Sequence, residues 1–192
     1  MTTRPRLPVR DGIGPTRLRV PSGGTWATVA DYMVATFTHL APDEVLRRVD
    51  AGEVYGADGR AIDLRSTPAD HEFVWYYRQL PDEQVLPYRE TILYRDDHLV
   101  VVDKPHFLPT TPSGRYLRET ALVRLRVALD NPHITPVHRL DRPTAGLVMF
   151  TASPDVRGAY QSLFERRHVD KTYEAVSAAP TGWDPATRRL DG

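Results

Sequence analysis

The first third of the chain changes from helical to strand periodicity near residue 52. Before that point apolar residues recur every three or four positions, which predicts a helix over 26–40 with its N-cap at Thr25. A second helix is expected from Pro42 to Gly52. Beyond it the apolar runs are short and separated by turn residues, so we expect strands there. These strands are predicted at 54–55, 61–64 and 73–77.

The pattern from residue 88 onward predicts a different arrangement. Two apolar runs flank Asp96-Asp97, which indicates a hairpin. Residues 118–129 have helical spacing, and Ser153 followed by proline favours the start of another helix. The remaining runs are predicted to be strands and lie at 147–150 and 169–176. Because strands, helices and a hairpin alternate irregularly, we predict an α+β fold with a mixed, mostly antiparallel sheet.

Changes in composition divide the chain into four parts. Residues 1–22 carry five arginines against one aspartate and several prolines and glycines, which is typical of a flexible basic arm. Such an arm can follow the phosphates of a nucleic acid, or it can be a solvated tail. The two helices and short strands predict a small module over 23–80, and residues 81–87 have the composition of a linker. The larger domain is then expected over 88–192.

Overall composition excludes several classes of function. The 192 residues carry 25 basic and 25 acidic side chains, so net charge gives no sign of nucleic-acid binding. The absence of cysteine excludes disulfides, thiolate catalysis and cysteine-ligated metals. No apolar run approaches the roughly 18 residues of a membrane span, and the N-terminus lacks a signal-peptide stretch. We therefore expect a cytoplasmic protein with no membrane partner. Only Lys104 and Lys171 of the basic residues are lysines, which draws attention to both.

Candidate catalytic chemistry is concentrated in residues 138–146. Three charged residues, Arg139, Asp141 and Arg142, lie within the four positions before Pro143. Proline keeps the preceding residue out of helical geometry, so we expect a rigid loop ahead of a buried strand. A charged carboxylate at the mouth of such a loop suits nucleophilic attack or proton abstraction. The alternative is a structural ion pair in which a flanking arginine braces the aspartate.

Three motifs carry a resemblance to a known family. Residues 138–147 read His-Arg-Leu-Asp-Arg-Pro-Thr-Ala-Gly-Leu, which resembles the signature of the RluA-type pseudouridine synthases. Residues 97–105 resemble the opening strand and Lys-Pro turn of that family, and residues 169–176 resemble its Lys-x-Tyr strand. The motifs follow the family's order, so the resemblance covers roughly 88–176. It implies the mostly antiparallel catalytic domain of these enzymes.

The resemblance also implies a reaction and a role for each matching residue. The chain would isomerise a uridine of structured RNA, rRNA or tRNA, after the base has been flipped out of its stack. Asp141 matches the catalytic aspartate, Tyr173 the tyrosine that packs on the flipped base, and Arg139 the arginine that enters the stack. Arg142 and Lys171 are expected to bind the RNA, and strand alternation would put Lys171 on the face of Tyr173. An isomerisation needs no cofactor, and neither a metal nor a cofactor is expected.

The module over 23–80 resembles the S-four-type RNA-binding fold in its order of helices, turn and short strands. In that family the second helix presents basic residues to RNA, and Arg47 and Arg48 occupy the matching place. The alternative is a small acidic module that only packs against its neighbour.

The chain departs from the family in two places. Residues 106–108 read His-Phe-Leu where the family commonly has Ala-Gly-Leu. The family also continues past the position of Gly192, with strands and an arginine that pairs with the catalytic aspartate. The sequence is then either a fragment or an unusual short member of the family. We expect a truncated product with an exposed apolar sheet edge or face that is prone to association. Such a product would bind RNA weakly and show little isomerase activity.

Two other functions stay open. A catalytically incompetent module would retain RNA without isomerising it. A small-molecule enzyme that uses Asp141 would not bind RNA at all. The oligomeric state is not predicted.

Overall fold

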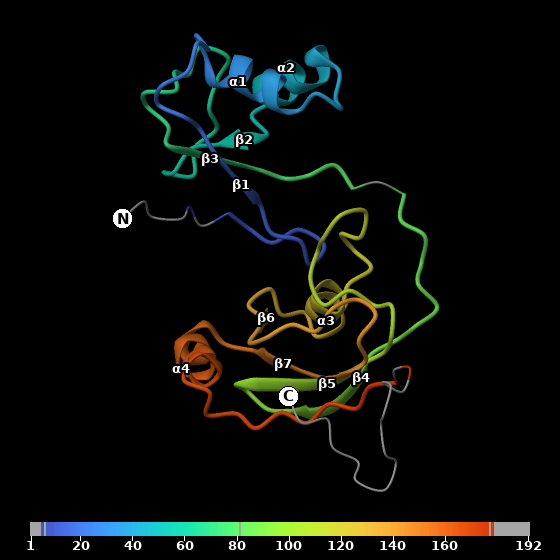
Figure 1. Cartoon of the computed structure of the whole chain (residues 1–192). Coiled ribbons are helices and arrows are strands. Elements are labelled where there is room, and N and C mark those ends of the chain that lie inside the picture. Colours follow the sequence, from blue (N-terminus) through green and yellow to red (C-terminus); the bar gives the residue numbers. More distant parts are fainter. Residues whose placement is uncertain (1–4, 6, 81, 177, 179–192) are drawn as a thin grey trace, which may run out of the picture.

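The computed structural model describes residues 5, 7–80, 82–176 and 178. The described residues form two antiparallel sheets, and Figure 1 shows them in two lobes joined by an extended stretch of chain. The prediction of an α+β fold with mostly antiparallel pairing is confirmed. Among the described helices, none has the length and apolar character needed to cross a membrane.

The N-lobe (residues 16–77) places two helices against a three-stranded sheet. Its elements are β1 (Thr16–Arg19), α1 (Val29–Thr36), α2 (Pro42–Asp50), β2 (Val54–Tyr55) and β3 (Phe73–Tyr76). β3 is central and pairs antiparallel with both β1 and β2. Valines from both helices and from the sheet form the core, so the helical spacing in the sequence marks the buried face.

Two N-lobe elements are shorter than predicted. α1 begins after Thr28 rather than Thr25, because Thr28 and Asp31 form a capping box with hydrogen bonds of 3.0 Å in each direction. The strand predicted at 61–64 is reduced to an isolated bridge with β2.

The C-lobe (residues 91–165) contains a four-stranded sheet with the order β4-β5-β7-β6. Its elements are β4 (Thr91–Arg95), β5 (Leu99–Lys104), α3 (Ala121–Ala128), β6 (Thr135–Pro136), β7 (Gly146–Thr151) and α4 (Pro154–Glu165). The hairpin predicted around Asp96-Asp97 is confirmed as β4 and β5. The helix start at Ser153 is also confirmed, since its hydroxyl accepts a hydrogen bond from the amide of Asp155 at 3.3 Å.

One face of the C-lobe sheet is buried, and the other is partly exposed. Alternate residues of β5 and β7 pack with the apolar face of α3, and Val102, Val148 and Phe150 are completely buried. The edge strand β4 is exposed along its whole length, with Leu93 57% and Tyr94 51% exposed. The expectation of an exposed apolar sheet edge is confirmed, while association through it stays a prediction.

The predicted arm and the predicted linker both make specific contacts with the rest of the chain. Part of the predicted arm, 1–22, forms β1, so the prediction of a flexible arm is wrong over that strand. Ahead of β1, the carbonyl of Gly12 accepts a hydrogen bond of 3.0 Å from Arg126 of α3. In the predicted linker, 81–87, the Glu83 carboxylate accepts hydrogen bonds from three successive backbone amides ahead of α3.

The strand predicted at 169–176 is wrong. No described residue of this segment has strand geometry, and Tyr173 is 63% exposed. A strand is stabilised by the backbone hydrogen bonds of a neighbour, and none of the described strands pairs with it. The sequence pattern therefore identified residues suited to a strand without supplying the partner that would make them one.

Candidate active site

The strand register brings the Lys-Pro turn and the aspartate-bearing loop to the same end of the C-lobe sheet. β5 and β7 pair antiparallel from Leu99 opposite Thr151 to Lys104 opposite Gly146. The chain leaves β5 just after Lys104 and enters β7 at Gly146, so residues 105–110 lie beside residues 138–146. We call the first segment the turn and the second the aspartate loop.

Hydrogen bonds hold the turn against the aspartate loop on both sides of Asp141. On one side, the Thr110 hydroxyl donates to the Leu140 carbonyl at 2.7 Å and accepts from the Leu140 amide at 3.3 Å. On the other side, the Phe107 amide donates to the Arg142 carbonyl at 2.7 Å, and Arg142 Nε donates to the Phe107 carbonyl at 3.3 Å. The residues before and after Asp141 are therefore fixed, which confirms a structured loop.

Asp141 itself is exposed at the turn of this loop. Its backbone carbonyl accepts a hydrogen bond from the Thr144 amide at 3.0 Å, which closes the turn. In the described part of the chain, the carboxylate forms no ion pair with Arg139 or Arg142. The structure thus gives no support to the bracing role considered from the sequence. It presents a carboxylate to solvent on a backbone held from both sides.

Lys104 is a buried cation beneath this loop, and the sequence analysis did not place it in the site. Its side chain is completely buried, and Nζ donates to the carbonyls of Pro105 at 3.1 Å and Leu108 at 2.8 Å. Burial lowers the pKa of Lys104, while the charge of Asp141 acts in the opposite direction. Lys104 therefore holds the turn and contributes positive charge near the candidate catalytic carboxylate. The sequence signals for it were the rarity of lysine and its place in the motif at residues 97–105.

His138, at the start of the aspartate loop, anchors the loop to α4. Its ring stacks on Phe164 with 4.7 Å between centroids, and Nε2 accepts a hydrogen bond from the Met149 amide at 3.2 Å. The Nζ of Lys171 lies 4.8 Å from the centre of the same Phe164 ring. The segment after α4 thus reaches the loop through this aromatic ring.

The pKa of His138 gives a prediction for the stability of the fold. Burial lowers this pKa from its ordinary value of 6.5, and the charge of Lys171 lowers it further. The stability that depends on a neutral ring is fully present above pH 6.5 and is lost as the pH falls through the lowered pKa of the folded state. We expect the melting temperature to fall on acidification below that pH, and to fall less in a His138→Gln variant. An equal fall of the melting temperature with pH in the unaltered protein and in the variant would show that His138 does not cause the loss of stability.

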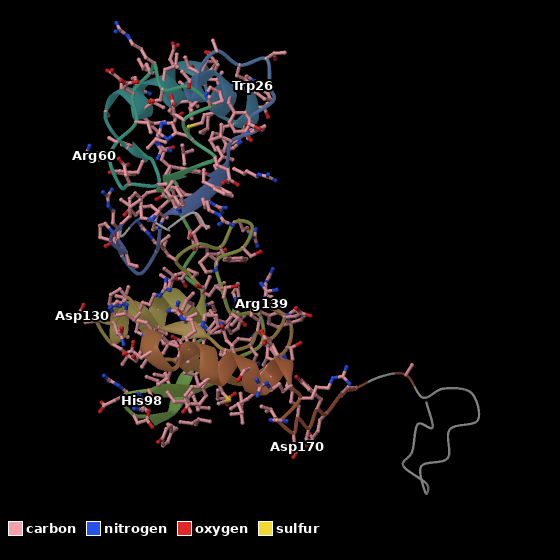
Figure 2. All side chains as sticks on the ribbon, turned by 90° about the vertical axis from the view of Figure 1, so that its left-hand side faces the viewer. Trp26, Arg60, His98, Asp130, Arg139 and Asp170 are labelled. Atoms are coloured by element: carbon pink, nitrogen blue, oxygen red, sulfur yellow. The ribbon has the colours of Figure 1, made fainter. Side chains whose placement is uncertain are left out.

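The other predicted site residues of the C-lobe differ in how close they lie to the aspartate loop. Arg139 lies exposed on the surface of the lobe, away from Asp130 (Figure 2). The Arg142 guanidinium lies 5.1 Å from the centre of the Tyr116 ring. Lys171 reaches Phe164, but no contact joins Tyr173 to the aspartate loop in the described chain. The structure therefore brings Asp141 and the two arginines together and leaves Tyr173 outside.

Arg47 and Arg48 of α2 differ in what they contact. Arg48 forms an ion pair of 2.8 Å with Glu53 and also donates to the carbonyl of Tyr77, and only 17% of its side chain is exposed. Arg47 is exposed, and its contact is with the carbonyl of Asp43 at 3.4 Å. The geometry makes Arg48 a packing residue and leaves Arg47 free to meet a phosphate.

We expect substitution of Arg48 to affect stability and substitution of Arg47 to affect RNA binding. Arg48→Ala should lower the free energy of unfolding by about 1–2 kcal/mol, because it removes a partly buried charged hydrogen-bonding group. Arg47→Ala should leave stability unchanged and lower the slope of log affinity for RNA against log salt by about one. Urea unfolding and a salt titration of RNA binding check these expectations. An Arg47→Ala variant with an unchanged salt slope would assign α2 to packing alone.

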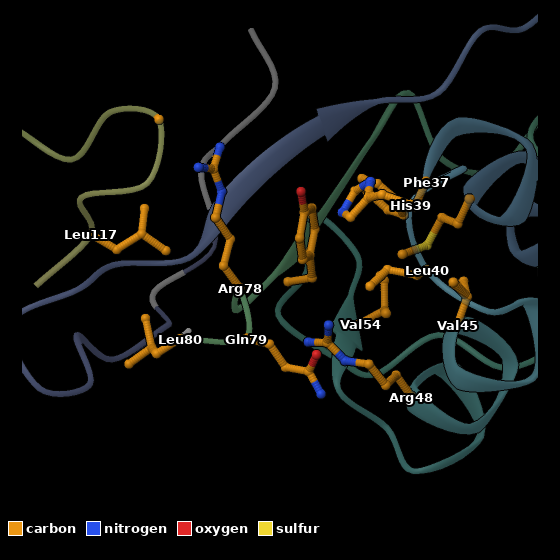
Figure 3. Close-up of a pocket in the computed structure, with 13 residues that line it drawn as sticks. Phe37, His39, Leu40, Val45, Arg48, Val54, Arg78, Gln79, Leu80 and Leu117 are labelled. Carbon is orange, nitrogen blue, oxygen red and sulfur yellow. The ribbon is translucent and has the colours of Figure 1, made fainter. Parts of the chain in front are cut away.

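The N-lobe also carries a pocket of about 670 Å³ that reaches Leu117 of the C-lobe. Figure 3 shows apolar side chains such as Phe37 and Leu40 on its N-lobe side, with Leu117 opposite. Arg48 is the one predicted site residue that lines it, and the aspartate loop does not. The pocket is therefore separate from the candidate catalytic carboxylate.

The described residues hold no group of three or more acidic, histidine or cysteine side chains that could bind a metal.

Comparison with known proteins connects this geometry to a family. Residues 98–187 match the family model described as RNA pseudouridylate synthase. An uncharacterized RNA pseudouridine synthase of Synechocystis is 26% identical over 146 residues, which are 76% of this chain and 50% of that protein. A tRNA pseudouridine synthase C of Haemophilus influenzae is 39% identical over 87 residues, which are 44% of this chain and 36% of that protein. The chain thus spans half or less of the length of these curated relatives.

Among solved structures, human RNA pseudouridylate synthase domain containing 4 is 30% identical, with a TM-score of 0.33. The alignment covers 40% of this chain and 30% of that one.

Proposed function

We propose that the protein isomerises a uridine in RNA to pseudouridine, and the premise is the match of residues 98–187 to the family model described as RNA pseudouridylate synthase. The observation that carries the proposal is the position of Asp141. Its carboxylate is exposed within the matched segment, on a loop fixed from both sides by hydrogen bonds to the turn. A reactive group held in one orientation is what catalysis of a bond rearrangement requires.

The reaction sets the demands on this site. The bond between ribose C1′ and base N1 breaks, C1′ bonds to C5 of the same base, the proton on C5 leaves to water, and N1 takes up a proton, so the product is an isomer of the substrate. No atom is gained from a second substrate, so the chemistry needs a nucleophile or base and a way to hold the detached uracil. Asp141 supplies the first, as a nucleophile or as a base toward the sugar.

The surrounding cations suit an RNA substrate. Arg139 and Arg142 flank the carboxylate and are both exposed, so they can neutralise phosphates or enter the base stack. Lys171 and Tyr173 follow α4, and we assign them to the substrate as well, with Tyr173 packing on the flipped uracil. Arg47 of α2 is a further candidate for a phosphate contact, and the N-lobe would then extend the RNA-binding surface.

Transfer RNA is the substrate class to test first, because several similar proteins are named tRNA pseudouridine synthase C. Ribosomal RNA is the alternative. We infer that the protein acts in the cytoplasm. No cofactor is assigned.

The test uses the full-length gene product and unmodified transcripts of tRNA and rRNA labelled with tritium at uracil C5. Formation of the new C1′–C5 bond releases the label to water, so time-dependent release from one class of transcript is expected. Binding without release would identify a non-catalytic RNA-binding protein. Neither binding nor release with any transcript would favour a small-molecule substrate for Asp141.

A further inference from the structure

Phe107, in the turn beside the aspartate loop, has an unfavourable backbone conformation. Its φ is +66°, in the left-handed region that glycine adopts freely and bulky side chains rarely enter. The chain therefore keeps a phenylalanine where a smaller residue would fold at lower cost.

The Phe107 side chain gains little from packing in return. Phe107 is 47% exposed as a residue, and its aromatic neighbours Tyr88 and His106 both lie 6.0 Å away between ring centroids. Leu108, the next residue, is completely buried and already fills the core position of the turn. A strained and exposed aromatic ring is costly for the free protein, so burial in the fold does not explain it.

The position of Phe107 is tied to the candidate catalytic carboxylate. Its amide and carbonyl form the two hydrogen bonds to Arg142 described above, at 2.7 and 3.3 Å. Arg142 directly follows Asp141, so the backbone of Phe107 is hydrogen-bonded to the residue next to the candidate catalytic carboxylate. His106 strengthens this connection through a contact of 2.6 Å between Nδ1 and the carbonyl of Pro143.

Arginines accompany the turn and the aspartate loop, and one of them, Arg142, contacts Phe107 directly. The guanidinium groups of Arg142 and Arg115 lie 5.1 and 4.9 Å from the centre of the Tyr116 ring. Arg139 is exposed on the aspartate loop itself. Exposed aromatic rings among arginines are the combination that binds single-stranded nucleic acid, in which bases stack on rings and phosphates meet cations.

We propose that Phe107 is a stacking platform for an unpaired nucleobase of the RNA, next to the uridine that Asp141 isomerises. This inference rests on the proposed function, because the partner is the same RNA. Extrusion of the target uridine leaves neighbouring bases without a stacking partner, and an aromatic face beside the carboxylate would receive one of them. Phe107 is thus a substrate-positioning residue whose contribution is to binding rather than to bond breaking.

The test measures the binding of a fluorescein-labelled, unmodified tRNA transcript to the full-length gene product by anisotropy. Phe107→Gly keeps the backbone hydrogen bonds, suits the positive φ and removes the ring. We expect its Kd to rise about 5- to 150-fold, the range for loss of one base–aromatic stack. Its melting temperature should be equal or higher, because glycine relieves the backbone cost. Phe107→Tyr keeps an aromatic face and should bind like the unaltered protein.

A matched control introduces glycine at another residue with a positive φ, far from the aspartate loop. Asp130 also has a positive φ, +46°, and Figure 2 places it across the C-lobe from Arg139. Asp130→Gly should leave the Kd unchanged. Equal affinity of the Phe107→Gly and unaltered proteins would overturn the inference, as would a loss of affinity shared by Phe107→Tyr or accompanied by a lower melting temperature. Failure of the unaltered protein to bind any transcript would instead overturn the proposed function.

Discussion

Replacement of Asp141 by asparagine is expected to lower turnover on RNA by about 100- to 10,000-fold, the range for loss of a positioned acid–base group. Asparagine keeps the shape of the side chain but loses its negative charge and basicity. The fold should be unaffected, because the carboxylate is exposed and forms no ion pair within the described chain. Tritium release under single-turnover conditions, together with the melting temperature, measures both effects.

A suitable control is Asp97→Asn, which removes the same charge from an exposed aspartate in the β4–β5 hairpin. That variant should turn over like the unaltered protein. RNA binding by Asp141→Asn should persist, which separates the chemical step from recognition. Residual turnover close to that of the unaltered protein would remove Asp141 from the reaction.

Replacement of Lys104 by methionine is expected to reduce both stability and turnover. The buried carbonyl of Leu108 and that of Pro105 lose their donor, which should lower the free energy of unfolding by about 2 kcal/mol. The turn that fixes the aspartate loop then loses its internal support. A displacement of about 1 Å at a catalytic group can cost roughly 100-fold in rate, and we expect a fall of about 10- to 100-fold in kcat.

The other lysine of the chain provides the comparison for stability. Lys171→Met removes an exposed cation above Phe164 and should change the free energy of unfolding by less than about 1 kcal/mol. Urea unfolding of both variants gives the difference. A Lys104→Met variant as stable and as active as the unaltered protein would show that the buried amine holds neither the turn nor the loop.

The elements that the sequence predicts correctly are those with local signals. The β4–β5 hairpin follows from apolar runs on either side of Asp96-Asp97, and the start of α4 follows from Ser153 with a proline after it. The loop around Asp141 was also identified correctly, because proline and charged residues restrict the backbone within a few positions. Each of these features is determined by neighbours in the chain.

The connections that complete the site have no such signal. Thr110 and Leu140 are 30 residues apart, and Phe107 and Arg142 are 35 apart, yet these pairs fix Asp141. Their bonds use backbone groups, one hydroxyl and one guanidinium, and none of these groups identifies its partner from the sequence. Only the register of β5 against β7 brings them together, and register is a tertiary property.

One error, the strand at 169–176, and one untested prediction, RNA binding by Arg48, have the same origin. The residues at 169–176 alternate as a strand would, but alternation does not state which strand lies alongside. Arg48 stands where an RNA-binding helix would present a cation, but the sequence did not show that Glu53 and Tyr77 already engage it. In both cases the residue type was identified correctly, and the partner decided its structural role.

The most direct test of RNA isomerisation at Asp141 is a nucleoside analysis of RNA after incubation with the full-length gene product. The transcript is digested to nucleosides, and pseudouridine and uridine are quantified beside the same reaction with the Asp141→Asn variant. Because the reaction is an isomerisation, we expect pseudouridine to appear in the amount by which uridine falls, and only with the unaltered protein. RNA that is bound by the unaltered protein and yields no pseudouridine, or equal pseudouridine from both proteins, would contradict the assignment of Asp141 as the catalytic residue of an RNA pseudouridine synthase.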